Sequence, residues 1–585
     1  MGDGTIGGEF APHVLREYSF IADGERGALI GPRGDLVWMC APSWDSDAVF
    51  CSLLGGVSEY VVAPTTTRYT WGGYYEDGTL IWHSRWVTTS GATECRAALA
   101  LPGEAKRAVV LRRVVAVDSD AEVRVALTPR AGFDVHQAHE CGVRDGVWTL
   151  RTGDLHLRLS GIPDGHFRDG RLEAVVAVPR GGYRDLVLEI ACGEPQDSPV
   201  DAVSAWARTE RTWRADVPAV EGTLADRDAR HAYAVLRGLT SSGGGMVAAA
   251  TTALPERAEQ GRNYDYRYCW IRDQCYAGVA VSAAGSYRLL DDAVHFVSAR
   301  LLDAGPGLVP AYRIDGRAVP TERHLDLPGY PGGTGIVGNW VNQQFQLDVF
   351  GEALLLFAAA DQWDRLDRDV WRAVEIAAGA IEQRWTEPDA GIWEIDNEDW
   401  THSRLVCVAG LRAAARIAPA RQSAQWTMLA DRVLADTSAR CLDRRTGVWR
   451  RSPDDDRVDV ALLLPAIRGA VAASDPRTVN TLGAVRRDLT QDGYVYRYRH
   501  RGRELADAEG AFLLCGYVMA LADDQQGDAW RAVRWFERNR AACGPPGLFT
   551  EEFDVIERQM RGDLPQAFVH AMLFETAHRL TDPRS

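Results

Sequence analysis

The spacing of apolar residues changes once along this chain of 585 residues, and the change constrains its architecture. From about residue 15 to residue 215, short alternating or continuous apolar runs recur between turn signals such as Asp77-Gly78 and Asp145-Gly146. This pattern is typical of antiparallel strands. Beyond a polar connector, apolar residues recur at spacings of three and four, which is typical of helices. We therefore predict two folded units of different class.

The boundaries of these units follow from where the pattern changes. We predict an N-terminal antiparallel β-sandwich over residues 1–200, a helical linker over 201–225 and a helical domain over 226–585. About a dozen candidate helices in the last segment favour an (α/α)6 barrel of six helical hairpins. The candidates include residues 229–239, 274–290, 345–361, 371–385, 405–417, 426–442, 508–522, 530–540 and 565–580.

The connections between these helices differ greatly in length. The longest are predicted at residues 250–273, 303–343, 385–402 and 543–564. A rigid helical scaffold usually carries its functional residues on such loops at one end. We therefore expect the functional site in these segments.

The charge and the rare residue types exclude several classes of function. A net charge of −16 argues against a nucleic-acid partner, which would require a basic surface. Lys106 is the single lysine and lies in a strand-like stretch, so Schiff-base, pyridoxal and Walker-type phosphate chemistry lack the lysine they need. None of the eleven cysteines has the spacing of a zinc site. We expect neither a cofactor nor a metal.

The chain also lacks the sequence features of export or membrane insertion. Its first residues do not combine a basic start with an apolar run. No window of about 18 apolar residues is present. We therefore expect a cytoplasmic protein with reduced cysteines and no membrane partner.

The segment 262–273 carries the densest group of candidate functional side chains. It mixes arginines, aspartates and tyrosines and ends with Trp270, Arg272 and Asp273. Charged pairs of this kind hold sugar hydroxyls through strong hydrogen bonds, and aromatic faces stack on sugar rings. Taken alone, the segment is also compatible with an aromatic-rich structural turn. Its composition favours a carbohydrate site.

Two carboxylates lie in separate loops further along the chain. Glu394 follows Trp393, and a carboxyl beside an indole in a poorly solvated loop is suited to donate a proton. Glu551 begins an acidic run that continues with Glu552. A pair of carboxyls can supply the acid and the base that cleave a glycosidic bond. Each carboxylate taken alone would be interpreted as a solvated loop residue.

Together these segments resemble glycoside hydrolase family 15, which includes glucoamylases, isomaltose-type glucosidases and bacterial trehalases. The resemblance spans nearly the whole chain. It implies that Glu394 is the general acid and that Glu551, rather than Glu552, is the general base. It also implies a set of sugar-binding residues: Trp270, Arg272, Asp273, Trp393, Arg497, Glu322 and Tyr330. For Arg497, a structural salt bridge remains an alternative.

The chain departs from the family pattern where the leaving group should lie. Ile395 directly follows the acid, as in trehalase-like bacterial members, whereas the starch-cleaving fungal members have a second acidic residue there. Asp396, Trp340 and His402 also replace the more usual residues. These differences leave the reaction class unchanged. They leave open the identity of the leaving group, and an unusual aglycone is one of the alternatives.

The resemblance implies an inverting, exo-acting α-glucoside hydrolase that releases β-glucose and needs no cofactor. The expected partner is a small intracellular α-glucoside of the isomaltose or malto-oligosaccharide type. The alternatives are a trehalase of the same family, or a lyase or dehydratase that uses the same acid–base pair on a secondary-metabolite glycoside. A phosphorylase would lack the base, and a non-catalytic binding protein would more often have lost one carboxylate. Linkage preference, stimulation by phosphate or metal, and assembly into a homo-oligomer stay open.

Overall fold

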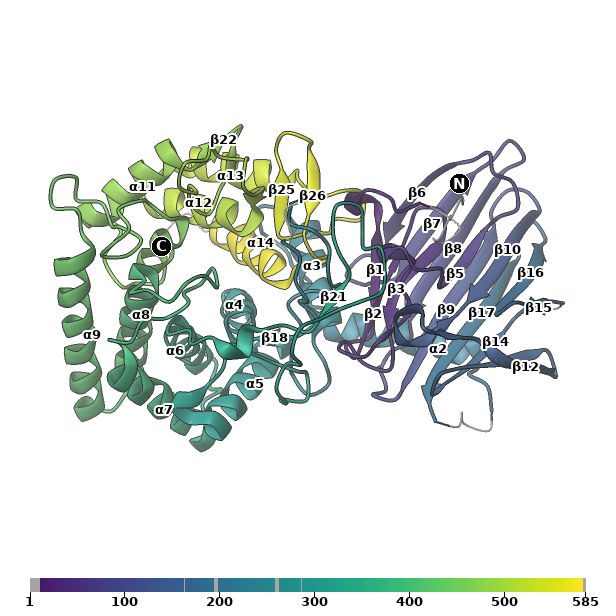
Figure 1. Cartoon of the computed structure of the whole chain (residues 1–585), viewed down its shortest axis with the longest axis horizontal. Coiled ribbons are helices and arrows are strands. Elements are labelled where there is room, and N and C mark those ends of the chain that lie inside the picture. Colours follow the sequence, from purple (N-terminus) through teal and green to yellow (C-terminus); the bar gives the residue numbers. More distant parts are fainter. Residues whose placement is uncertain (1–10, 163, 194–197, 258–261, 286, 582–585) are drawn as a thin grey trace.

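The computed structural model describes residues 11–162, 164–193, 198–257, 262–285 and 287–581. A unit of β-sheets lies beside a unit of helices, at the right and the left of Figure 1 respectively. The predicted β-sandwich followed by an (α/α)6 barrel is confirmed. Within the described ranges, no helix has the length and apolar character needed to cross a membrane.

Two eight-stranded antiparallel sheets form the β-unit. The first has the order β1-β2-β3-β5-β10-β16-β15, with β4 paired to β3, and the second has the order β12-β13-β14-β17-β9-β8-β7-β6. The strands of the first sheet are β1 (Ser19–Ala22), β2 (Gly27–Ile30), β3 (Asp35–Cys40), β4 (Ala48–Phe50), β5 (Glu59–Pro64), β10 (Ala121–Thr128), β15 (His166–Arg168) and β16 (Arg171–Val178). Those of the second are β6 (Thr70–Tyr75), β7 (Trp82–Val87), β8 (Ala92–Leu99), β9 (Arg107–Ala116), β12 (His139–Arg144), β13 (Val147–Thr152), β14 (Leu155–Ser160) and β17 (Tyr183–Cys192).

The two sheets share a core because side chains alternate between the faces of each strand. Along β16, every second residue from Leu172 to Val178 is buried, and the residues between them are more exposed. These buried residues belong to the same hydrophobic cluster as Val110 of β9 and Leu157 of β14. The period of two therefore produces the sandwich. The helix α2 (Ala202–Asp216), in the segment predicted as a helical linker, packs on β17.

Twelve helices form the helical unit in the described part of the chain. Helices α4, α6, α8, α10, α12 and α14 contact one another in a closed inner ring, and the odd-numbered helices lie outside it. The bounds are α3 (Asp226–Leu239), α4 (Ile271–Ser282), α5 (Arg288–Ala304), α6 (Asp348–Asp361), α7 (Arg368–Arg384), α8 (Thr401–Ile417), α9 (Ala420–Cys441), α10 (Leu464–Ile467), α11 (Pro476–Asp488), α12 (Leu513–Gln525), α13 (Ala529–Arg540) and α14 (Ala567–Arg579).

Apolar content decides which helices are inside. Nearly every residue of α6 is buried and most of them are apolar, whereas α7 buries one face only. Gly351 of α6 and Gly410 of α8 meet where these inner helices touch. A Cβ at Gly410 would lie 2.4 Å from the carbonyl oxygen of Gly351, so glycine is required for this approach.

The connections of the barrel place the site. Each inner helix follows an outer helix, and a long connection precedes each of the inner helices α4, α6, α8, α10, α12 and α14. The connections that leave the inner helices are short, such as the one between α12 and α13. Because the hairpins all point the same way, the long connections gather at one end of the ring.

Two of the predicted helix boundaries are wrong. Residues 274–290 are predicted as one helix, but α4 ends at Ser282 and α5 begins at Arg288. Gly285 lies in this break, and glycine is a poor helix former. The stretch 508–522 begins with the strand β24 (Ala511–Phe512) before it becomes α12, because a short apolar run suits a strand as well as a helix.

Candidate active site

Five of the long connections converge on one pocket of about 100 Å³. Seven of the nine predicted site residues line it, namely Trp270, Arg272, Asp273, Trp393, Glu394, Arg497 and Glu551. Their positions range over about half of the chain, and the closed ring of inner helices brings them together. The sequence motifs therefore meet in one place.

Trp270 and Arg272 contact the carboxylate of Glu394. Trp270 ends the two-residue strand β18 (Cys269–Trp270), and α4 begins at the next residue. The indole Nε1 of Trp270 donates to Oε1 of Glu394 at 2.6 Å, and Nη2 of Arg272 donates to the same oxygen at 3.2 Å. Asp273 is buried beside Arg272. Burial raises the pKa of Asp273 to about 7, although the Arg272 guanidinium opposes this shift.

Glu394 lies in a strained turn before α8. Its φ is +54°, in the left-handed region that residues other than glycine rarely adopt. The amide of Glu394 donates to the carbonyl of Gly391 at 3.2 Å, and Gly391 itself has a φ of +68°. A Cβ at Gly391 would lie 2.7 Å from the Trp400 ring. The turn therefore needs glycine at residue 391 to present Glu394 to the pocket.

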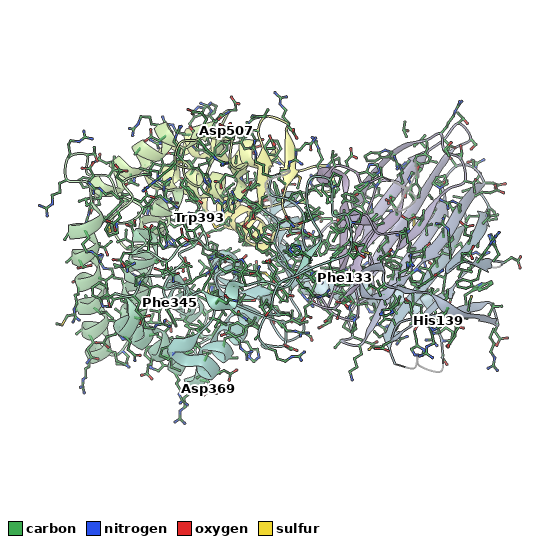
Figure 2. The ribbon with its side chains drawn as sticks, viewed as in Figure 1. Phe133, His139, Phe345, Asp369, Trp393 and Asp507 are labelled. Atoms are coloured by element: carbon green, nitrogen blue, oxygen red, sulfur yellow. The ribbon has the colours of Figure 1, made fainter. Side chains whose placement is uncertain are left out.

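Trp393 and Arg497 form an adjoining wall of the pocket. The indole Nε1 of Trp393 donates to Oδ1 of Asp459 at 2.9 Å, and Figure 2 shows Trp393 within the ring of helices. The Arg497 guanidinium lies 5.5 Å from the centre of the Trp393 ring and pairs with Glu509 at 2.6 Å. Arg497 therefore both lines the pocket and holds a buried salt bridge.

Glu551 reaches the pocket from the last long connection. Its carbonyl accepts from the Leu513 amide at 2.9 Å, which fixes it beside the N-terminus of α12. Burial and the neighbouring Glu256 raise the pKa of Glu551 well above its ordinary value. Glu552 does not line the pocket, because its side chain turns away to accept from the Gly510 amide at 2.7 Å. The geometry favours Glu551 over Glu552 as the pocket carboxyl.

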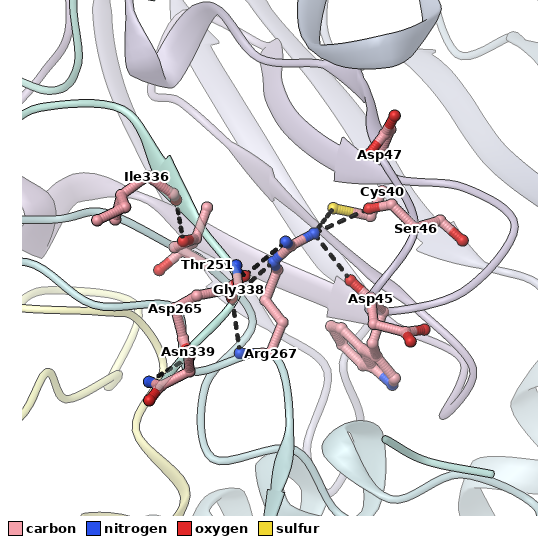
Figure 3. Close-up of polar contacts among 12 residues, drawn as sticks. Cys40, Asp45, Ser46, Asp47, Thr251, Asp265, Arg267, Ile336, Gly338 and Asn339 are labelled. Atoms are coloured by element: carbon pink, nitrogen blue, oxygen red, sulfur yellow. Dashed lines mark hydrogen bonds and ion pairs between the residues drawn. The ribbon is translucent and has the colours of Figure 1, made fainter. Parts of the chain in front are cut away.

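The loop before α4 is anchored to the β-unit by Arg267. Its guanidinium pairs with Asp265 at 2.7 Å and donates to the Ser46 carbonyl at 2.8 Å, as Figure 3 shows. Oδ2 of Asp265 in turn accepts from the Gly338 amide at 2.8 Å, next to the pocket residue Asn339. A single buried ion pair therefore joins the β-unit to two loops of the pocket.

The helical unit and the β-unit each match a known family model. The model for glycosyl hydrolases family 15 matches residues 230–578, more than half of the chain. The model for the trehalase-like N-terminal domain matches residues 5–215. The chain belongs to glycosyl hydrolase family 15. It is therefore a glycoside hydrolase, as the motifs implied.

Relatives of this family 15 hydrolase align along its whole length. A trehalase of Mycolicibacterium smegmatis is 28% identical, with 97% of this chain and 91% of that protein covered. A trehalase of Mycobacterium tuberculosis is 29% identical, with 96% and 88% covered. Among solved structures, a bacterial glucoamylase complexed with acarbose superposes with a TM-score of 0.73 at 14% identity, covering 99% of this chain and 96% of that one. The last similarity shows the fold alone.

Two predicted sugar-binding residues of the family 15 hydrolase lie outside the pocket. Glu322 is exposed to solvent. Tyr330 is buried against the N-terminal segment, where its hydroxyl donates to the His13 carbonyl at 2.6 Å. The middle of the connection between α5 and α6 contacts the β-unit, because the Gly329 amide donates to the Leu54 carbonyl at 2.9 Å. The resemblance placed this whole loop at the sugar, but only its later part reaches the pocket.

The pocket also contains residues to which the sequence assigned no individual role, among them Glu256, Tyr266, Asn339 and Gln566. Tyr266 belongs to the aromatic motif and packs edge-on against Trp270, with ring centres 5.4 Å apart. Glu256 gave only a weak signal, an acidic residue a few positions before Arg262. Its pairing with Arg262 at 3.0 Å is visible only in the folded loop.

The side of the pocket beyond Glu394 is wide. Glu394 also lines a second cleft of about 490 Å³ with Trp340, Gln344 and Asp396. Trp340 is 40% exposed there, which suits a face for a leaving group. His402, expected in the same region, instead lies buried behind the turn, 4% exposed. Burial and the nearby Arg272 lower the pKa of His402 to about 3.

Proposed function

We propose that this family 15 hydrolase cleaves small α-glucosides with inversion, with Glu394 as general acid and Glu551 as general base. The observation that carries the proposal is that both carboxyls line one pocket together with Trp270 and Arg272. Fixed positively charged and aromatic groups around two carboxyls are what a glycosidase site requires. Arg272 and Asp273 are assigned to the hydroxyls of the terminal glucose.

Each carboxyl has one task in this mechanism. Glu394 gives its proton to the glycosidic oxygen as the bond to the leaving group breaks. Both donors to Glu394 contact Oε1, so Oε2 carries the transferred proton. Glu551 takes a proton from water as the water oxygen bonds to C1 on the opposite face of the sugar. The two carboxyls should lie about 6.5–9.5 Å apart to accommodate that water.

Trehalose is the first candidate substrate. The support is that two relatives named trehalase align with 96–97% of this chain and with 88–91% of their own lengths. Isomaltose and short malto-oligosaccharides are the second candidates. The wide cleft beyond Glu394, with its exposed Trp340, favours leaving groups larger than one glucose.

Glucose release from trehalose, isomaltose, maltose and panose tests the proposal. One of these sugars should be turned over by the wild type. Glu394→Gln and Glu551→Gln should each lower kcat by about 10²–10⁴-fold or more, because each removes one proton transfer. Glu394→Gln should still bind substrate in calorimetry. A folded wild type that leaves all four sugars intact would move the assignment to an unusual glycoside or a non-hydrolytic reaction.

A further inference from the structure

A third carboxyl lies beside Glu551 in the pocket. Glu256 is 3% exposed and lines the same cavity. Its Oε2 lies 3.0 Å from Nη2 of Arg262, and the Tyr266 hydroxyl donates to its Oε1 at 3.5 Å. Glu551 lines the same cavity, and the side chains of Glu256 and Glu551 both approach Gly562. The mechanism proposed above gives Glu256 no task.

The backbone holds these two carboxyls together. The Gly562 amide donates to the carbonyl of Pro255 at 2.9 Å, which ties the segment of Glu256 to the hairpin of β25 (Glu552–Asp554) and β26 (Gln559–Arg561). Gly562 has a φ of +85°. A Cβ there would lie 3.4 Å from Cβ of Glu551 and 3.8 Å from Cγ of Glu256. The side chains of Glu256 and Glu551 are therefore held as neighbours by the fold.

Charged and titratable groups from three segments face this pair. They are Arg262 and the titratable Tyr264 and Tyr266 from the loop before α4, Arg497 and Glu509 from the connection before α12, and Glu552 and Asp563 from the connection before α14. Arg262 pairs with Glu256, so a guanidinium lies against this buried carboxyl. Two carboxyls can form a hydrogen bond to each other only when one of them holds a proton.

We propose that Glu256 is a positioning residue that shares one proton with Glu551 and thereby sets the pH at which Glu551 becomes a base. The inference rests on the proposed function. Glu256, paired with Arg262, shares the proton that Glu551 holds at acid pH. Once this proton has left to solvent, Glu551 can take a proton from water, hydroxide bonds to C1 and the proton of Glu394 goes to the leaving oxygen. Loss of the proton from Glu551 and reprotonation of Glu394 then restore the site, so one water is consumed in each turnover.

The pH profile of kcat/KM separates this role from a merely structural one. In Glu256→Gln, the like charge beside Glu551 is gone, so the acid limb should move to lower pH by about one unit or more. The plateau kcat should fall because Glu551 becomes a weaker base. The ratio of variant to wild-type activity should therefore rise as the pH falls. Glu256→Asp should restore part of the wild-type limb.

Glu382→Gln is the matched control, because Glu382 is an exposed carboxylate on helix α7, outside the pocket. Its profile should coincide with that of the wild type. An acid limb of Glu256→Gln that stays in place, or that moves to higher pH, would overturn the inference. A loss of activity by the same factor at every pH would also overturn it, because that would indicate a structural role alone.

Thermal unfolding tests the pair without any substrate. The shift in Tm should be measured for Glu256→Gln, Glu551→Gln and the double variant at about neutral pH. Since both single changes remove the same shared proton, the shift of the double variant should differ from the sum of the single shifts. Additive shifts would show that the two carboxyls are independent. If the wild type hydrolyses no α-glucoside, the proposed function fails. The comparison of single and double variants still tests whether Glu256 and Glu551 share a proton, because it needs no substrate.

Discussion

At the scale of single residues, the site depends on backbone positions as much as on side chains. Glu394 adopts a left-handed φ, and the turn that holds it closes on Gly391. Trp400 packs against Gly391 where a side chain would otherwise lie. Strain of this kind is common where a catalytic group has to be presented in one orientation.

Gly391→Ala should therefore disturb both stability and activity. The new Cβ collides with Trp400 and the positive φ is unfavourable for alanine, so the free energy of unfolding should fall by about 1–3 kcal/mol. kcat/KM should fall by about tenfold or more because Glu394 moves. Urea unfolding and steady-state kinetics measure the two effects. Gly379→Ala is the control, since its Cβ meets nothing within 4 Å on helix α7, and it should gain about 1 kcal/mol.

At the scale of elements, the inner helix α6 carries carboxyls that the mechanism does not use. Asp348 and Glu352 are 0% and 1% exposed. Burial raises the pKa of Asp348 to about 6 and that of Glu352 to about 8, although Arg272 and Arg468 oppose the shifts. These carboxyls make stability depend on pH.

Glu352→Gln should stabilise the protein increasingly as the pH rises. The folded state holds a proton on Glu352 that the unfolded state releases above about pH 4.5, so wild-type stability falls from there to about pH 8 and then levels off. Glutamine does not titrate, so the variant does not lose stability in this way. The free energy of unfolding of Glu352→Gln, relative to that of the wild type, should be roughly 2–5 kcal/mol greater at about pH 8 than at about pH 5. Denaturant unfolding at both pH values measures it. The control is Glu382→Gln on the exposed face of α7, whose unfolding free energy should change between the two pH values by as much as that of the wild type. If Glu352→Gln also showed the wild-type change, the account would be contradicted.

The elements were largely predictable because their patterns are local. The helix 229–239 is recovered in α3, and 371–385 in α7, since apolar residues at helical spacing bury one face of each. Glu322 and Tyr330 show the limit of such reasoning. The resemblance implied that their loop faces the sugar, but contacts to the N-terminal unit hold the part around Tyr330 outside the pocket, and such contacts between distant segments leave no local pattern. The partner of Glu551, Glu256, was missed for the same reason.

At the scale of the whole molecule, the β-unit supports the active site of the helical unit. One hydrophobic cluster contains both Trp38 of β3 and residues of the inner helices. The indole of Trp38 donates to the Ala250 carbonyl at 2.9 Å, in the loop that leads to the pocket. The Arg267–Asp265 pair lies in the same interface, with side chains 2% and 0% exposed.

Arg267→Leu should destabilise the molecule and impair the site together. It leaves the Asp265 carboxylate buried without its partner, which costs about 3–5 kcal/mol. kcat/KM should also fall, because Asp265 positions the Gly338 amide beside Asn339. Arg323→Leu is the control at the same interface, since its pair with Asp47 is exposed and should contribute about 1 kcal/mol or less. Equal losses of unfolding free energy for the two variants would contradict the account.

The anomer released first tests the central claim, inverting hydrolysis by Glu394 and Glu551, most directly. Time-resolved proton NMR should be recorded on the substrate that the wild type turns over. From isomaltose or maltose, the glucose cleaved from the non-reducing end should appear first as the β-anomer. From trehalose, inversion at one unit should give equal initial amounts of β- and α-glucose. Initial release of the non-reducing-end glucose as the α-anomer from isomaltose or maltose, or of α-glucose alone from trehalose, would contradict the account.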